Sequence, residues 1–293
     1  MGSDPEHAPI LPEGRAVDLP GRGVTFVREL PGPPGAPTLV LLHGWTATAA
    51  LNWRDCFAPL ASEFRVVAPD HRGHGRGIRS RGPFRLEDCA DDVAALADAL
   101  GIERCIPVGY SMGGPVAALV WRRHPALVEG LVLCATAARF IPLGARQVAL
   151  TSGVLGLAWA VTASPGGLLR AAHDRFVSSR VAASPFGEWV ASEIGPSDPA
   201  SLIQAGAALR RFDAGPWLDA IDVPTAVIVT NADNVVAPFR QRRLAAGISG
   251  ARSYDVEGDH AVCTTDPDRF VPILASACRE VSGRAAAHPR ARR

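Results

Sequence analysis

Short runs of consecutive apolar residues recur along the chain, and longer segments with helical patterning separate them. Such runs are typical of parallel strands that are buried on both faces of a sheet. The clearest runs lie at residues 38–42, 65–69, 130–134 and 225–229, and a further strand is predicted at 252–256. This alternation of strands and helices predicts a doubly wound, mostly parallel α/β sheet.

Residues 88–100 illustrate the helical pattern between the strands. Val93, Leu96, Ala97 and Leu100 recur at the spacing of one helical face, and Gly101 follows as a typical helix-ending residue. Nearer the start of the chain, residues 24–30 alternate like a strand and are followed by a turn rich in proline and glycine at 31–37. We therefore expect a hairpin that leads into the sheet.

The strand pattern stops between residues 139 and 220, where helical apolar patterns are interrupted by proline and glycine. A segment of this length is too long for a plain loop in a compact domain, so we predict a helical cap insertion at 139–220. The core of the fold is then expected at 23–138 and 221–282. Residues 1–22 are expected to be a flexible segment and residues 283–293, rich in alanine and arginine, a disordered tail.

The charge balance excludes several classes of partner. The chain of 293 residues carries 30 basic and 29 acidic side chains, for a formal net charge of +1. No strong field therefore favours nucleic acid or an anionic membrane, and a small neutral or amphiphilic substrate is the expected partner. Every basic side chain other than histidine is arginine, which excludes a lysine Schiff base.

The cysteines and the apolar stretches indicate a compartment. The six cysteines are scattered, with neither a disulfide framework nor a zinc pattern, and the first twenty residues do not resemble a secretory signal. The longest uncharged apolar stretch, residues 148–163, falls short of the roughly 20 residues that span a bilayer. We therefore predict a cytoplasmic protein without a transmembrane segment. The patterns predict no particular oligomeric state.

One pentapeptide carries a chemical signal. Gly109-Tyr110-Ser111-Met112-Gly113 follows a predicted strand at 104–108 and precedes a predicted buried helix at 115–121. Glycines two residues on either side of a serine permit a sharp turn between a strand and a helix, which exposes the serine hydroxyl. Ser111 is therefore the candidate nucleophile.

A serine nucleophile needs a histidine to accept its proton and a carboxylate to orient that histidine. Asp233 and His260 each come directly after a predicted strand, and the carboxyl ends of parallel strands meet at one edge of the sheet. Asp259 is a rival acid, but it adjoins the histidine and would point away from its ring. Three further rivals, Asp213, Asp219 and Asp222, cluster before the preceding strand.

Two turns can supply amide donors for the oxyanion of a tetrahedral intermediate. The Met112 amide begins the helix after the nucleophile, and the Trp45 amide follows His43-Gly44 at the end of the strand at 38–42. We expect His43 to brace this loop rather than to act as a base.

Two local patterns could suggest bound groups. His71 and His74 lack a third metal ligand at a sensible spacing, so they are expected to pack within their loop. The pattern Gly73-x-Gly75-x-Gly77 does not open a helix within a βαβ unit and does not predict a dinucleotide site. We expect no metal and no cofactor.

Together these residues resemble the α/β-hydrolase family. The resemblance covers about residues 24 to 282. It rests on His43-Gly44-Trp45, Asp70-His71-Arg72-Gly73-His74-Gly75, Gly109-Tyr110-Ser111-Met112-Gly113-Gly114, Asp233 and His260, in the family order of nucleophile, acid and histidine. It implies an eight-stranded, mostly parallel sheet with a cap after the sixth strand. One departure is Gly77, where the family often has a serine.

The nucleophile narrows the expected activity. An aspartate at this turn would indicate a dehalogenase or an epoxide hydrolase, whereas serine implies acyl transfer followed by attack of water. We expect a carboxylic ester or thioester with a hydrophobic acyl group. Apolar side chains that could line its pocket, or could simply pack the cap against the sheet, are Tyr110, Leu155, Trp159, Phe186, Trp189 and Trp217.

Other activities stay open at this point. Hydrolases of carbon–carbon bonds, enol-lactonases and cofactor-free perhydrolases share the same three catalytic residue types. A non-catalytic ligand-binding protein can also retain them, as hormone receptors related to these enzymes do.

Overall fold

Eight strands form one sheet in the computed structural model, which describes residues 11–80, 82–140 and 186–287 together with residues 171, 174, 175 and 178. The strand order is β1-β2-β4-β3-β5-β6-β7-β8. Strands β3 to β8 run parallel to one another, and β1 and β2 are antiparallel additions beside β4. The strands are β1 (Gly14–Leu19), β2 (Gly23–Leu30), β3 (Thr38–Leu42), β4 (Arg65–Pro69), β5 (Ile106–Tyr110), β6 (Leu131–Cys134), β7 (Thr225–Thr230) and β8 (Arg252–Val256).

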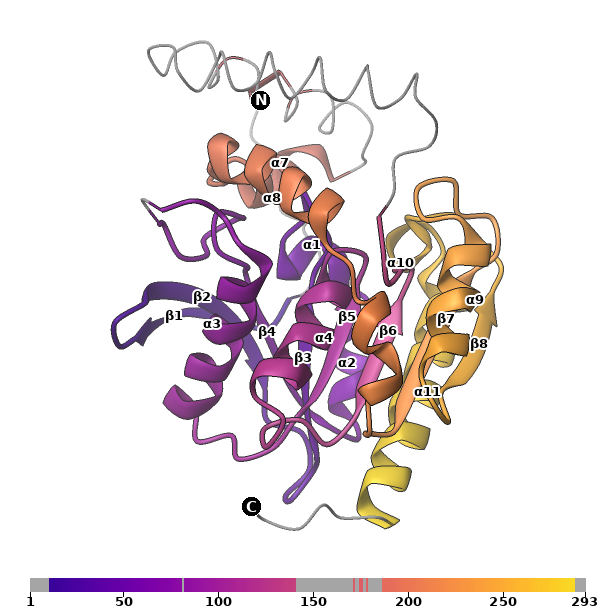
Figure 1. Cartoon of the computed structure of the whole chain (residues 1–293). Helices are drawn as coiled ribbons and strands as arrows, with labels where there is room; N and C mark the ends of the chain where they lie inside the picture. The colour runs from indigo at the N-terminus through magenta and orange to yellow at the C-terminus, as the bar shows by residue number, and fades with distance from the viewer. Residues whose placement is uncertain are drawn as a thin grey trace.

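Helices cover both faces of this sheet, as the continuous apolar strands require (Figure 1). Successive residues of β3 point to opposite faces: Val40 and Leu42 belong to one buried cluster, and Leu39 and Leu41 belong to the other. The first cluster includes α3 (Leu86–Ala99), α4 (Gly113–Arg123) and α9 (Pro238–Gly247). The second includes α1 (Ala49–Trp53), α2 (Phe57–Ala61), α10 (Val262–Thr265) and α11 (Pro267–Ala287).

The predicted hairpin and the two ends of the chain differ from expectation. Residues Gly14–Leu19, which were expected to be flexible, form β1 and pair with β2 along their whole length. The hairpin is therefore β1 with β2, because β4 lies between β2 and β3 in the sheet. At the other end, residues 283–287 belong to α11 rather than to a disordered tail, since Arg284 donates to the Gly250 carbonyl and to Glu280.

The described part of the predicted cap insertion is helical. It contains α7 (Gly187–Ile194), α8 (Pro199–Arg211) and the 3₁₀ helix η2 (Gly215–Ala220). Figure 1 shows α7 and α8 lying across one end of the sheet. Most of residues 141–185 lie outside the described residues.

A buried carboxylate attaches the cap to the core. Glu193 of α7 is only 3% exposed. Its carboxylate accepts hydrogen bonds from Arg76 at 3.1 Å and Arg28 at 3.4 Å, and from the Thr48 hydroxyl at 3.2 Å. A buried charge is tolerated only when it is paired in this way, so the position of α7 on the core is specified by this cluster.

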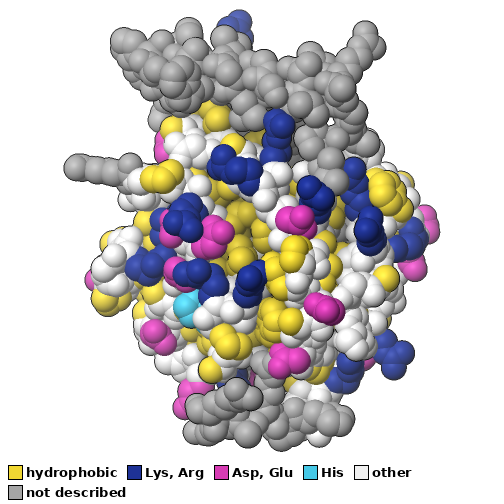
Figure 2. All heavy atoms as spheres, viewed as in Figure 1, with side chains coloured by type: hydrophobic (Ala, Val, Ile, Leu, Met, Phe, Trp, Pro, Cys, Tyr) yellow, Lys and Arg dark blue, Asp and Glu magenta, His cyan; other side chains and the backbone are white. Residues whose placement is uncertain are grey.

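The surface agrees with the nearly neutral net charge. Basic and acidic side chains are interspersed on the face that Figure 2 shows, over the same elements as in Figure 1. Among the helices that the structure describes, none combines the length and the apolar character of a membrane span.

Candidate active site

The turn that carries Ser111 connects β5 to α4 and has no room for side chains at its two flanking glycines. A Cβ on Gly109 would overlap the Gly113 carbonyl, and a Cβ on Gly113 would overlap the Leu42 carbonyl. Ser111 itself has a φ of +51°, a left-handed conformation that costs a non-glycine residue on the order of 1 kcal/mol or more. The amide of Ser111 donates to the Cys134 carbonyl at 2.9 Å, which holds the strained turn against β6.

Ser111, His260 and Asp233 are brought together by three different strand ends. The Ser111 Oγ lies 2.9 Å from Nε2 of His260, and Nδ1 of the same ring lies 2.7 Å from Oδ2 of Asp233. A carboxylate accepts only, so Nδ1 carries the proton and Nε2 is left free to accept one from the serine hydroxyl. The arrangement can therefore deprotonate Ser111 as the hydroxyl attacks a carbonyl carbon.

Asp233 is held in place by a full set of donors. Its Oδ1 accepts from the amides of Val235 and Val236, both at 2.8 Å, and its Oδ2 accepts from the Thr230 hydroxyl at 2.8 Å and Gln241 Nε2 at 3.1 Å. Burial raises the pKa of this carboxyl, but the His260 ring and these donors outweigh burial and bring the pKa below its usual range. The group is thus an anion that faces the histidine.

The rival carboxylates lie elsewhere. The Asp259 side chain is exposed and accepts from the Ala261 amide at 2.8 Å. Asp213 caps the Gly215 amide, and Asp222 accepts from the Trp121 indole at 3.0 Å. Asp219 is exposed on η2. None of the four contacts His260 in the described part of the chain.

Tyr110, which precedes the serine, also contacts the histidine. Its hydroxyl donates to the backbone carbonyl of His260 at 2.9 Å, and its ring centroid lies 5.9 Å from that of the imidazole. The tyrosine ring packs in turn against Trp53 and Phe270 at edge-to-face geometry. Tyr110 therefore links the core to the loop that carries the histidine.

The loop after β3 passes close to the serine, since a Cβ on Gly44 would stand 3.4 Å from Ser111 Cβ. The amides of Trp45 and Met112 donate to no protein acceptor within the described residues. The preceding amide, of Gly44, donates to Asn52 Oδ1 at 2.9 Å, and Asn52 Nδ2 reaches Cys263 Sγ at 3.5 Å. Asn52 thus ties this loop to the helix that follows the histidine, a role that no local sequence pattern indicated.

The Trp45 side chain lies against the cap. Its indole Nε1 donates to the Leu202 carbonyl of α8 at 2.7 Å. A Cβ on Gly206 would stand 2.7 Å from the indole ring, so glycine is needed there for the ring to fit. The loop that carries the Trp45 amide is therefore clamped between the core and α8.

Three buried histidines, His43, His71 and His74, support the same loop. Nε2 of His43 accepts from the His71 amide at 2.9 Å, so its Nδ1 carries the proton and donates to the Gly44 carbonyl at 2.8 Å. The rings of His71 and His74 pack on it at 4.3 and 5.4 Å. Burial lowers the pKa of His43 to about 4 and of His74 to about 3, so the cluster is neutral.

This cluster does not form a metal site in the residues that the structure describes, where no group of three possible ligands is suitably placed. The neighbouring Gly77, the departure from the family pattern, lies where a Cβ would overlap the backbone carbonyls of Asp70 and His71. The backbone segments of this loop are therefore closely packed against one another.

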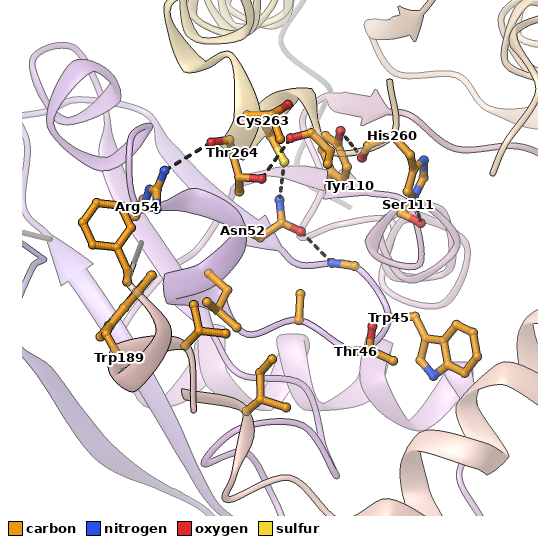
Figure 3. A pocket seen from close by; sticks show the side chains of 18 residues that line it. Trp45, Thr46, Asn52, Arg54, Tyr110, Ser111, Trp189, His260, Cys263 and Thr264 are labelled. Carbon is orange, nitrogen blue, oxygen red and sulfur yellow. Dashed lines mark hydrogen bonds between the residues drawn. The ribbon is translucent and has the colours of Figure 1, made fainter. Parts of the chain in front are cut away.

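A pocket of about 610 Å³ opens beside Ser111 (Figure 3). Of the predicted lining residues, Tyr110, Phe186 and Trp189 line it. Leu155 and Trp159 lie outside the described residues. Trp217 is placed elsewhere, because it stacks on Trp121 and packs with Phe212 against the apolar cluster around α4.

Comparisons with known proteins identify the family. A family model described as the alpha/beta hydrolase fold matches residues 37–156. The carbamate hydrolase candidate RutD of Rhizobium rhizogenes is 31% identical over 242 residues, which make up 81% of this chain and 90% of that protein. The chain belongs to the α/β-hydrolase family.

Solved structures extend this result. An enol-lactonase from Burkholderia xenovorans is 25% identical, with a TM-score of 0.75, and the match covers 90% of this hydrolase and all of that chain. A hydrolase from Pseudomonas aeruginosa is 26% identical, with a TM-score of 0.73 over 91% of this chain and 98% of that one. Because these relatives are named as hydrolases and lactonases, this member of the family is an enzyme.

Proposed function

We propose that this hydrolase cleaves a carboxylic ester or thioester with a hydrophobic acyl group through an acyl-enzyme on Ser111. The observation that carries the proposal is the position of the His260 ring, 2.9 Å from the serine oxygen and 2.7 Å from the Asp233 carboxylate. A neutral imidazole in this position can accept the serine proton and later return it to the leaving group.

The proposed cycle has two halves. The Ser111 oxygen attacks the carbonyl carbon while His260 Nε2 takes its proton, and the negative oxygen of the tetrahedral intermediate accepts from the Trp45 and Met112 amides. The carbon–oxygen or carbon–sulfur bond then breaks, and the leaving group takes the proton from the imidazole. Water repeats the sequence on the acyl-enzyme, releasing the acid and the free serine.

The lining of the pocket supports an acyl group that is mainly apolar. Phe186, Trp189, Val190 and Ile194 form its cap side, and Leu51 lies on its core side. Burying such side chains against a methylene chain contributes roughly 0.8 kcal/mol for each CH₂ group. An acyl chain is therefore expected to bind more tightly as it lengthens until the pocket is filled.

A carbamate is the second candidate substrate, because the named relative is a carbamate hydrolase candidate at 31% identity. The same groups would serve, since attack on a carbamate carbonyl also forms a tetrahedral oxyanion. Enol-lactone hydrolysis, carbon–carbon bond hydrolysis and perhydrolysis would each be recognised by a different product, and a binding protein would form no product at all.

The cytoplasmic location predicted from the sequence stays a prediction. All six cysteines are buried free thiols, which is the form that a reducing compartment maintains.

The test uses a fluorophosphonate probe and p-nitrophenyl esters of increasing acyl length. We expect the wild type to be labelled on Ser111 and to turn over the esters, with kcat/KM rising with chain length, and Ser111→Ala to lose both properties. Wild-type enzyme that neither reacts with the probe nor turns over any ester or carbamate would refute the proposal. Labelling without turnover of any acyl substrate would instead favour a binding protein.

A further inference from the structure

A charged side chain lines the pocket beside Ser111. Among the described residues that line it, Arg54 is the single Arg, Lys, Asp or Glu side chain. We propose that Arg54 binds an anionic group at the far end of the acyl chain, so that the substrate is an ω-carboxyacyl ester or thioester rather than a purely apolar one. This inference rests on the proposed acyl transfer to Ser111 and specifies the substrate class.

The guanidinium is fixed in position by contacts on several sides. Arg54 directly follows α1, and its side chain is 17% exposed. Its Nε donates to Asp55 Oδ2 at 2.7 Å, and its Nη2 donates to the Thr264 carbonyl at 3.2 Å. The ring of Phe186 lies over it, 5.0 Å from Cζ to the ring centroid. A cation held in this way loses little conformational entropy when it binds a ligand.

Donor capacity remains on this side chain. Guanidinium has five N–H groups in a planar fork that matches a carboxylate. Within the described part of the chain, Nη1 makes no hydrogen bond, so one nitrogen of the fork is available to a ligand in the pocket.

Asp55 pairs with Arg54 from outside the pocket lining. Its side chain is 34% exposed, so water screens part of its attraction for the guanidinium, whereas the Arg54 side chain lines the pocket. The neighbouring Thr264 and Thr265 add polar atoms to the same wall. That wall is thus suited to an anion.

The position of Arg54 sets where the anion would lie. In Figure 3, Arg54 and Trp189 stand at the opposite end of the lining from Ser111 and His260. The apolar side chains of Leu51, Val190 and Ile194 also line this pocket. A substrate that reaches both ends needs a scissile carbonyl, an apolar middle and a terminal anion, as in a monoester of a dicarboxylic acid.

The experiment compares two esters of equal acyl length. Mono-p-nitrophenyl adipate is an anion at pH 7.5, and p-nitrophenyl hexanoate is its neutral counterpart. We expect the wild type to prefer the adipate ester in kcat/KM. Arg54→Met should lower kcat/KM for adipate by about 10- to 100-fold, the range for a hydrogen bond to a charged group, and should change hexanoate by less than about threefold. Arg54→Lys should retain part of the preference.

Arg279→Met is the matched control, because Arg279 pairs with Glu63 at 2.7 Å on the surface and does not line the pocket. It should leave both rates unchanged. A wild type that hydrolyses hexanoate at least as well as adipate, or an Arg54→Met variant that loses both activities equally, would overturn the inference while leaving acyl hydrolysis in place.

A measurement on the unmodified enzyme does not depend on how the variants fold. Adipate should bind the wild type in isothermal titration at least 10-fold more tightly than adipamide, its neutral isostere, because only the carboxylate can pair with the guanidinium. Equal binding of the two would refute the anion subsite. Absence of ester turnover together with selective adipate binding would refute the proposed function and retain the subsite.

Discussion

Replacing Asp233 with asparagine should block catalysis by changing which nitrogen of His260 carries the proton. The amide oxygen of the new side chain would stay on the side of Oδ1, where the amides of Val235 and Val236 donate at 2.8 Å. The amide nitrogen would then replace Oδ2 and face His260 Nδ1 at about the present 2.7 Å. Two donors cannot share one hydrogen bond, so Nδ1 must become the acceptor.

The magnitude follows from this tautomer. With the proton on Nε2, the imidazole cannot accept the proton of Ser111, although every atom is close to its original place. An asparagine in the equivalent role of a Ser-His-Asp triad costs about 10⁴ in kcat, or about 5.4 kcal/mol of transition-state stabilisation. We expect Asp233→Asn to lose kcat on p-nitrophenyl hexanoate by that factor, with little change in KM.

The control is Asp259→Asn, which changes the rival carboxylate next to the histidine. Its side chain caps the Ala261 amide on the surface, so kcat should stay within about threefold of the wild type. Circular dichroism and the thermal midpoint of both variants report whether the fold is retained. A folded Asp233→Asn enzyme with more than about a tenth of wild-type kcat would refute the assignment of Asp233 as the orienting acid.

Three further predictions concern the loop, the cap and pH. Asn52→Ala leaves the buried Gly44 amide without its acceptor, so the free energy of unfolding measured in guanidinium chloride should fall by about 1–3 kcal/mol. We also expect kcat to fall more than KM rises. An unchanged kcat would contradict a role of Asn52 in holding the loop. Glu193→Ala removes a buried carboxylate from its arginine partners and should lower the free energy of unfolding by about 3 kcal/mol in the same assay. A decrease below about 0.5 kcal/mol would show that the cluster does not anchor the cap. His43 and His74 are protonated near pH 6.5 in the unfolded chain but only near pH 4 and pH 3 in the folded chain. The free energy of unfolding is therefore full above pH 6.5 and falls as pH decreases, by about 2 kcal/mol for each ring at pH 5. A flat stability profile between pH 7 and 5 would contradict the buried neutral cluster.

The strands and helices of the core were predictable because each is specified by nearby residues. The strand predicted at 252–256 coincides with β8, and the helix predicted at 88–100 differs from α3 by two residues at its start and one at its end. The strand before Ser111 was placed too early, at 104–108 rather than Ile106–Tyr110. Gly109 and Tyr110 join this strand because they pair with Leu133 and Cys134 of β6, and Gly109 also with Leu42 of β3, which a local pattern cannot show.

The rest of the site depends on contacts between residues far apart in the chain. Asn52 and Cys263 are separated by 211 positions, and Arg54 and Thr264 by 210. Neither pair has a characteristic spacing, so both residues of the α1 region escaped the sequence analysis. Trp217 shows the opposite error, since an aromatic residue in a predicted cap suits a pocket wall and a packed core equally well, and the stacking partner Trp121 decides between them.

The contact between Trp45 and α8 has a consequence for protein engineering. Caps of this family are attractive parts to exchange when a new specificity is wanted, because they are contiguous in sequence. In this enzyme a transplanted cap would have to bring both a glycine at the place of Gly206 and, at the place of Leu202, a carbonyl that can accept from the Trp45 indole. A chimera without these two features would shift the backbone next to the nucleophile, and its turnover number would suffer along with its substrate range.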